Sequence, residues 1–328
     1  MCDGRGIIKV LVAGSSLTIR THQNRKPIYS NLIFTRFNLL GNSSMRCRAK
    51  PLRLIALLTV AVLILSACGG GHQTRFAVTP PTQAPIAATP TPLPTRAPEE
   101  APNIREHQLY SSITGITYPV HVYLPEDYNS TDRTYPIIYT TDGQWVFGGF
   151  RNQLYQFGID AILVAIEQGP NDRRAVDYRL PGAVNYFQVL VTELLPIMES
   201  EYRADQSQRT LVGTSYGGLF VGIALLIDDV VAPNFINYLS FDGSFYENPN
   251  GWHELLSDRF NANQTLNATL VLTTATEFGN HGSVSDFNRR LDANNFDGLD
   301  IIRFDIPVRH NDVAPPSFEQ ALQALFIR

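Results

Sequence analysis

From about residue 103 onward, the chain alternates between two kinds of hydrophobic pattern. Short apolar runs rich in β-branched and aromatic residues are followed by segments in which apolar side chains recur every three or four positions. The first pattern predicts buried strands and the second predicts amphipathic helices. We expect strands within 106–123 (a pair), 135–140, 161–166, 209–214, 235–241, 268–274 and 299–306, and helices at 183–202, directly after 214 and at 316–327.

The segment 183–202 is the clearest predicted helix. Its apolar positions form one stripe, made of Val184, Phe187, Val191, Leu194, Leu195, Met198 and Tyr202. Such a stripe faces a core. Strands separated by helices predict a mostly parallel central sheet with helices on both faces. We therefore expect one α/β domain over 103–328, with functional side chains at the carboxyl ends of its strands.

Residues 45–68 have a different pattern. Basic positions after Met45 precede an apolar run from Leu54 to Leu65, which is typical of a secretory signal peptide. The run is shorter than the roughly 20 residues that a membrane-spanning helix needs. Its ending, Leu65-Ser-Ala-Cys68-Gly69, resembles a bacterial lipobox. We therefore predict a lipoprotein that Cys68 anchors in the membrane, on the extracytoplasmic side of a bacterial cell envelope.

The segments on either side of this signal are not expected to fold. Residues 1–44 are polar and mixed and fit poorly before a signal peptide, so we predict that they are not translated, with Met45 as the true start, or unstructured. Residues 69–102 are crowded with Pro, Thr and Ala. Such a composition buries too little apolar surface to offset its ordering entropy, and it predicts an extended linker.

Composition excludes several function classes. The formal net charge is −4 and the basic residues are scattered, so nucleic acid is not an expected partner. The three cysteines, Cys2, Cys47 and Cys68, all precede residue 103, so the domain has no disulfide and no thiol nucleophile. Its histidines show no metal-ligand spacing. We expect neither a metal nor another cofactor.

The most specific motif is Gly213-Thr-Ser215-Tyr-Gly217, between a predicted strand and a predicted helix. A G-x-S-x-G segment in this context is typical of a nucleophile elbow, whose sharp turn leaves no room for side chains at the flanking glycines. Ser215 is therefore the candidate nucleophile. The alternative is a turn or helix-capping serine.

A serine hydroxyl needs a base that takes its proton as it attacks. His310 lies just past the last predicted strand and before the last predicted helix, where hydrolases with this motif place their base. His253 and His281 are competing histidines that we interpret as surface residues. For the acid that orients the base we predict Glu277, just after the strand at 268–274, with Asp286 on the following helix as the alternative.

A serine mechanism also needs two backbone N–H donors for the oxyanion. The residue after the nucleophile, Tyr216, would supply one donor. The second would come from the loop Thr141-Asp-Gly-Gln-Trp145, where Gly143 permits a tight bend and Gln144 or its neighbour directs its N–H toward the site. The alternative for Asp142-Gly143 is an ordinary turn.

Five segments together resemble the putative esterase family of α/β hydrolases: Val122–Tyr128, Tyr135–Gln144, Glu193–Pro196, Gly213–Phe220 and His310. That family includes enterobactin-type siderophore esterases, S-formylglutathione hydrolases, feruloyl esterases and mycolyltransferases. The resemblance implies an α/β-hydrolase fold with Ser215 as nucleophile, His310 as base and oxyanion donors at Tyr216 and Gln144. It also implies that some relatives work with a Ser-His dyad. This chain departs from the family at Thr214, often histidine, and at Asp242-Gly-Ser-Phe-Tyr246, usually Ser-Pro-Ser.

We therefore expect a surface-tethered serine esterase that hydrolyses a small-molecule carboxylic ester through an acyl-enzyme. Two alternatives remain open. The chain could be a non-catalytic lipoprotein that binds ligands on a hydrolase fold, or an acyltransferase, which differs from a hydrolase only in the second nucleophile.

Overall fold

The computed structural model describes residues 10–12, 17–19 and 103–327, and the chain divides into two compact units, Met1–Thr82 and Gln83–Arg328. In the first unit, β1 (Val10–Val12) and β2 (Leu17–Ile19) pair antiparallel. The predicted signal peptide at 45–68 and linker at 69–102 lie outside the described residues. Of the helices that are described, none is long and apolar enough to cross a bilayer.

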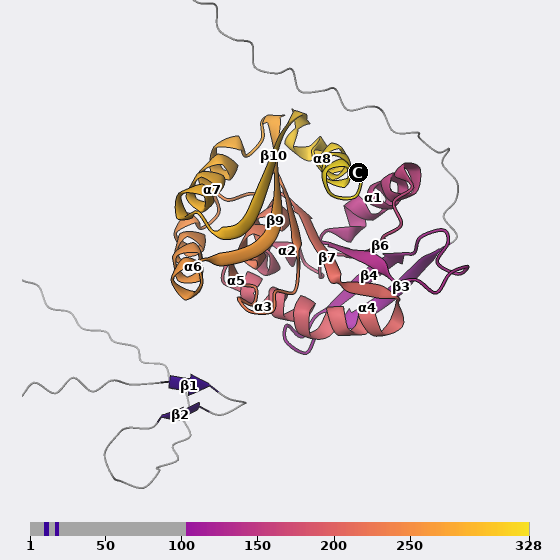
Figure 1. Ribbon diagram of the computed structural model, residues 1–328, viewed down its shortest axis with the longest axis horizontal. Helices are drawn as coiled ribbons and strands as arrows, with labels where there is room; N and C mark the ends of the chain where they lie inside the picture. The colour runs from indigo at the N-terminus through magenta and orange to yellow at the C-terminus, as the bar shows by residue number, and fades with distance from the viewer. Residues whose placement is uncertain (1–9, 13–16, 20–102, 328) are drawn as a thin grey trace, which may run out of the picture. The chain divides into compact units, whose positions relative to one another are not determined.

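The second unit is built on an eight-stranded sheet with the order β10-β9-β8-β7-β5-β6-β4-β3 (Figure 1). The strands β10, β9, β8, β7, β5 and β6 run parallel to one another. Strand β4 pairs antiparallel with both β6 and β3. The strands are β3 (Ile104–Tyr110), β4 (Thr117–Tyr123), β5 (Tyr135–Thr140), β6 (Ile162–Ile166), β7 (Ala204–Thr214), β8 (Asn237–Phe241), β9 (Thr265–Glu277) and β10 (Asp297–Arg309).

Helices cover both faces of this sheet. On one face, α1 (Gly143–Phe157) and α8 (Ala314–Leu325) lie side by side and pack through the stacked rings of Phe150 and Phe318 (Figure 1). The other face carries α3 (Gly182–Gln188), α4 (Leu195–Glu201), α5 (Tyr216–Ile227), α6 (Pro249–Ala262) and α7 (His281–Asn294). The fold is therefore the α/β-hydrolase arrangement that the sequence predicted.

The continuous apolar runs of the central strands follow from this layering. In β7, Leu211 packs into the core beneath α3 and α5, whereas the next residue, Val212, packs into the core beneath α1 and α8. Neighbouring residues of a strand point to opposite faces, so a strand covered on both sides carries apolar residues at successive positions. A hydrophobic core therefore lies on each face of the sheet, and the strand ends are the places where polar side chains can meet.

All the predicted strands occur, and the predicted helix at 183–202 is a continuous run of α3, a π-helical segment Val189–Leu194 and α4. One residue of its predicted stripe is wrong, because Val184 is 38% exposed and lies off the buried face. The segment after β5, expected to be a loop, turns directly into the first residues of α1. The short helix α2 (Arg174–Asp177) was not predicted.

Candidate active site

Three polar side chains meet at the carboxyl ends of three parallel strands. Ser215 follows β7, Asp242 follows β8, and His310 begins a short 3₁₀ turn after β10. Because parallel strands all end at the same edge of the sheet, residues far apart in the chain converge there. The convergence produces a chain of hydrogen bonds from serine to histidine to aspartate.

Ser215 sits in a strained turn between β7 and α5. Its φ is 60° and its ψ −115°, a region that residues other than glycine rarely adopt. A Cβ on Gly213 would lie 2.3 Å from the carbonyl oxygen of Gly217, and one on Gly217 would lie 2.3 Å from Oγ1 of Thr141. The steric need for both glycines, predicted from the motif, is thus confirmed, and the elbow presents the Ser215 hydroxyl above the strand ends.

His310 connects the serine to the acid. Its Nε2 lies 3.0 Å from Oγ of Ser215, and its Nδ1 lies 2.5 Å from Oδ2 of Asp242. An ionised carboxylate can only accept hydrogen bonds, so the Nδ1 atom carries the proton and donates it to Asp242. Nε2 is then left as the acceptor for the serine hydroxyl. This is the geometry of a nucleophile, a base and an orienting acid.

The acid that contacts the base is therefore Asp242, and the prediction of Glu277 is wrong. Glu277 is the last residue of β9, has a side chain that is 58% exposed, and lies 3.8 Å from the guanidinium of Arg309. The alternative, Asp286, faces away on α7, where Arg290 Nε hydrogen-bonds it at 3.0 Å. That bond, helped by Arg289, lowers the pKa of Asp286. Strand β9 continues three residues beyond the predicted 268–274, which carries Glu277 past the site.

Asp242 is fully buried and held at several atoms. Its backbone N–H donates to the carbonyl of Thr273, and its Oδ1 accepts from the backbone N–H of Asn280 at 2.9 Å. The Asn280 side chain donates to the Asp242 carbonyl at 2.7 Å. A buried carboxylate needs such donors to remain charged. Asn280 therefore holds the acid against His310, although no motif in the sequence marks it.

The two predicted oxyanion positions lie at the starts of two helices. Tyr216 is the first residue of α5 and Gln144 the second residue of α1, and first-turn N–H groups have no acceptor within their own helix. The Gln144 side chain points elsewhere, since its Oε1 accepts from the backbone N–H of Gln168 at 3.0 Å. The structure thus places both backbone segments at the carboxyl edge, and their role as oxyanion donors stays a prediction.

A pocket of about 360 Å³ opens over the Ser215 hydroxyl. It is lined by Asp142, Trp145, Val146, Arg174, Thr214, Ser215, His310, Asn311 and Ala314. Among these residues, Arg174 and Asp142 form a bidentate ion pair with two N–O distances of 2.9 Å. Asp142 is buried beside the predicted oxyanion segment and has a left-handed φ of 59°, whereas the Arg174 side chain is 15% exposed. Burial raises the pKa of Asp142, and Arg174 offsets part of that rise.

The competing histidines lie apart from this centre. His253 is on α6, with its Nε2 3.5 Å from Asp286, and His281 is an exposed residue at the start of α7. Within residues 103–327, no cluster of three or more His, Cys, Asp or Glu side chains is placed to hold a metal ion. The predicted lipid-carrying Cys68 lies outside the described residues.

One signal in the sequence pointed to Asp242. It directly follows the predicted strand at 235–241, so the rule that selected Glu277 at the end of one strand applied equally to Asp242 at the end of another. The order serine, acid, histidine also holds for residues 215, 242 and 310. The sequence pattern did not show which of the two strand ends lies nearer the histidine.

Comparison with known proteins gives a family-model match and a shared fold. The chain matches the family model described as "Putative esterase" over residues 111–265. Comparison with curated proteins found no match.

Several solved structures share the fold. An IroE-like serine hydrolase from Shewanella oneidensis is 24% identical with a TM-score of 0.59, covering 68% of this chain and 80% of its own. The BES protein from Bacillus cereus is 24% identical with a TM-score of 0.58, and the match covers 70% of this chain and 96% of the BES chain. The siderophore hydrolase EstB from Aspergillus nidulans is 19% identical with a TM-score of 0.54, and the match covers 70% of this chain and 97% of the EstB chain. Residues 111–265 therefore match the putative esterase family model, and the domain that contains them has the α/β-hydrolase fold.

Proposed function

We propose that this hydrolase is a serine esterase that cleaves small-molecule carboxylic esters through an acyl-enzyme. The observation that carries the proposal is the continuous hydrogen-bonded chain from Ser215 through His310 to the buried Asp242. The esterase family match and the fold shared with siderophore hydrolases support the same reaction class. The chain lacks a cysteine after residue 68, so serine chemistry has no thiol competitor in the domain.

In the proposed mechanism, the Ser215 oxygen attacks the ester carbonyl while His310 Nε2 accepts the hydroxyl proton. Asp242 stabilises the imidazolium that forms. The carbonyl oxygen becomes an oxyanion, which the backbone N–H groups at Tyr216 and Gln144 stabilise. Collapse of the intermediate breaks the bond to the leaving alcohol, which takes the proton from His310. Water then attacks the acyl-enzyme by the same steps and releases the acid.

Siderophore-type esters are the substrate class that we propose first. Structures named as siderophore hydrolases share the fold, and the pocket over Ser215 has room for a substrate acyl group. Transfer of the acyl group to a second alcohol would use the same residues. A product analysis in the presence of added alcohols separates hydrolysis from transfer.

A fluorophosphonate probe tests the serine mechanism directly. The probe should label the native protein once, and mass spectrometry of the digested protein should place the label on Ser215. Ser215→Ala should abolish both labelling and ester hydrolysis. The matched control is Ser244→Ala, which removes a hydroxyl 3.3 Å from that of Ser215 and should leave labelling intact. An unlabelled protein that still binds esters would indicate the non-catalytic alternative.

We also propose that Cys68 tethers the domain to the outer side of a bacterial membrane. The lipobox-like ending Leu65-Ser-Ala-Cys68-Gly69 and the Pro-rich segment after it support this location. The linker would let the hydrolase domain reach substrates beyond the lipid surface.

A further inference from the structure

A second cavity lies at the end of the domain opposite to Ser215. It has a volume of about 50 Å³ and is bordered by the last turn of α5, the loop after it, α6 and the start of β9. Helix α5 begins beside Ser215 and ends at Ile227, and the next residue, Asp228, lies at the border of this cavity. The cavity is therefore separate from the candidate active site, and the proposed mechanism makes no use of it.

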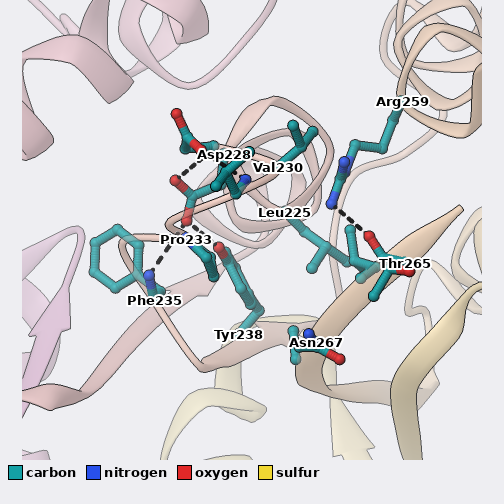
Figure 2. Close-up of a pocket in the computed structure, with 13 residues that line it drawn as sticks. Leu225, Asp228, Val230, Pro233, Phe235, Tyr238, Arg259, Thr265 and Asn267 are labelled. Atoms are coloured by element: carbon teal, nitrogen blue, oxygen red, sulfur yellow. Dashed lines mark hydrogen bonds between the residues drawn. The ribbon is translucent and has the colours of Figure 1, made fainter. Parts of the chain in front are cut away.

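Arg259 is a buried cation whose hydrogen bonds are incomplete. It extends from α6, is only 7% exposed, and donates from Nη2 to the carbonyl of Thr265 at 3.0 Å. Its buried Nε and Nη1 atoms have no hydrogen-bond partner among residues 103–327. Figure 2 shows the guanidinium facing Asp228 and Val230 across the cavity. Unpaired donors on a buried cation are costly, so this arrangement calls for an acceptor.

Asp228 does not supply that acceptor, although it borders the same cavity. Its carboxylate is occupied by donors from its own loop and from β8: the backbone N–H groups of Asp229, Asn234 and Phe235, the Asn234 amide and the Tyr238 hydroxyl. These neutral groups satisfy the carboxylate without an ion pair to Arg259. Burial lowers the pKa of Arg259, and the nearby acids offset only part of this effect. Within the described part of the domain, the cation therefore has no direct counter-ion.

We infer that this cavity is a binding site for a small monocarboxylate, such as acetate or propionate, with Arg259 as its charged partner. A planar carboxylate matches the donor geometry of a guanidinium. A cavity of about 50 Å³ holds on the order of four water-sized groups, which is the size of acetate.

The walls of the cavity favour a carboxylate over other anions. Leu225, Val230 and Ala268 present apolar surface that a short alkyl chain can cover. Asp228 and Asp229 at the same border would repel a doubly charged anion such as hydrogen phosphate more strongly than a monocarboxylate. A bare chloride would leave the apolar surface uncovered. The site thus favours one negative charge with a small apolar body.

The test is a titration of the full-length protein with sodium propionate at pH 7 by isothermal titration calorimetry, at constant ionic strength. Propionate should bind with a Kd on the order of 1 mM, as expected for so small a ligand. Arg259→Leu should weaken binding at least tenfold. Arg289→Leu is the matched control, since it removes the same charge from a side chain that is 67% exposed. It should bind as the native protein does.

A second variant covers the case in which Arg259→Leu does not fold. Val230 is 37% exposed at the border of the cavity, so Val230→Phe should fill the space without disturbing the core, and it should also abolish binding. Absence of binding to the native protein would overturn the proposal. So would equal binding by Arg259→Leu or Val230→Phe, and so would binding of chloride as tightly as propionate.

Discussion

Nδ1 of His310 lies 2.5 Å from Oδ2 of Asp242, although the two residues are 68 positions apart in the chain. Asp242 follows β8, the strand next to the one that leads to Ser215, and the Asp242 side chain is fully buried. A buried acid with a single histidine partner holds the ring in one tautomer more firmly than an exposed acid would. This pairing determines which carboxylate is expected to matter for turnover.

Asp242→Asn should lower kcat by up to about 10⁴-fold, because the amide leaves the His310 ring free to adopt the wrong tautomer. Glu277→Gln is the matched control, and it should change kcat little because that side chain is exposed and pairs with Arg309. Steady-state kinetics on a chromogenic ester would measure both. A large loss for Glu277→Gln with an unaffected Asp242→Asn would contradict the assignment, whereas unchanged turnover in both would indicate a Ser-His dyad.

Gly213→Ala should destabilise the fold by roughly 1–3 kcal/mol, because the new methyl group would lie 2.3 Å from the backbone oxygen of Gly217. Backbone cannot move aside as a flexible side chain can. Gly148→Ala is the control, since a methyl group there meets nothing within 4 Å and α1 should gain about 0.5–1 kcal/mol. Urea unfolding monitored by circular dichroism compares the two, and equal stabilities would refute the steric account of the elbow.

Arg174→Met should cost about 3–5 kcal/mol of unfolding free energy at neutral pH, because it leaves the Asp142 carboxylate buried without its partner. The double variant Asp142→Asn with Arg174→Met should recover part of that loss. Urea denaturation at fixed pH provides the measurement. A single variant as stable as the native protein would mean that the ion pair contributes no stability.

The same variant should show a defined pH dependence. Burial already raises the pKa of Asp142 in the native fold, and loss of Arg174 removes a group that lowers it. The folded state then holds a proton that the unfolded state releases, so stability falls as pH rises above the ordinary aspartate pKa of about 3.9. The destabilisation of Arg174→Met should therefore be larger at pH 8 than at pH 5. The double variant should lose this difference, and the opposite slope would exclude Asp142 as its origin.

Cys68→Ser should release the protein from the membrane fraction and leave ester hydrolysis unchanged, because no candidate site residue precedes residue 142. Cys47→Ser is the control and should stay in the membrane fraction, since it lies before the predicted lipidated residue. Detergent partitioning with Triton X-114 and an activity assay on both phases measure the effect. A Cys68→Ser protein that is processed and still partitions with detergent would disprove the lipid anchor.

Local patterns in the sequence predicted most of the fold. Each strand of the parallel sheet is a short apolar run because both its faces are covered, and Leu211 and Val212 show this directly by packing into different cores. The elbow was also predictable, because its two glycines, its serine and its flanking elements are all close in the chain. Helix α1 was missed because the Asp142-Gly143 pair that begins it is typical of a turn.

The class of fold, the strained serine and the strand-end histidine could be predicted because each depends on residues within about one element of the chain. The contact of His310 with Asp242 rather than Glu277 was visible only in the folded chain, because it depends on how far β9 extends and on which strand ends lie together. The ion pair of Arg174 with Asp142 and the unpaired donors of Arg259 depend likewise on contacts between distant segments. The hydrophobic periodicity of a segment shows which face of that helix or strand is buried. It does not show which polar side chain of another element contacts it.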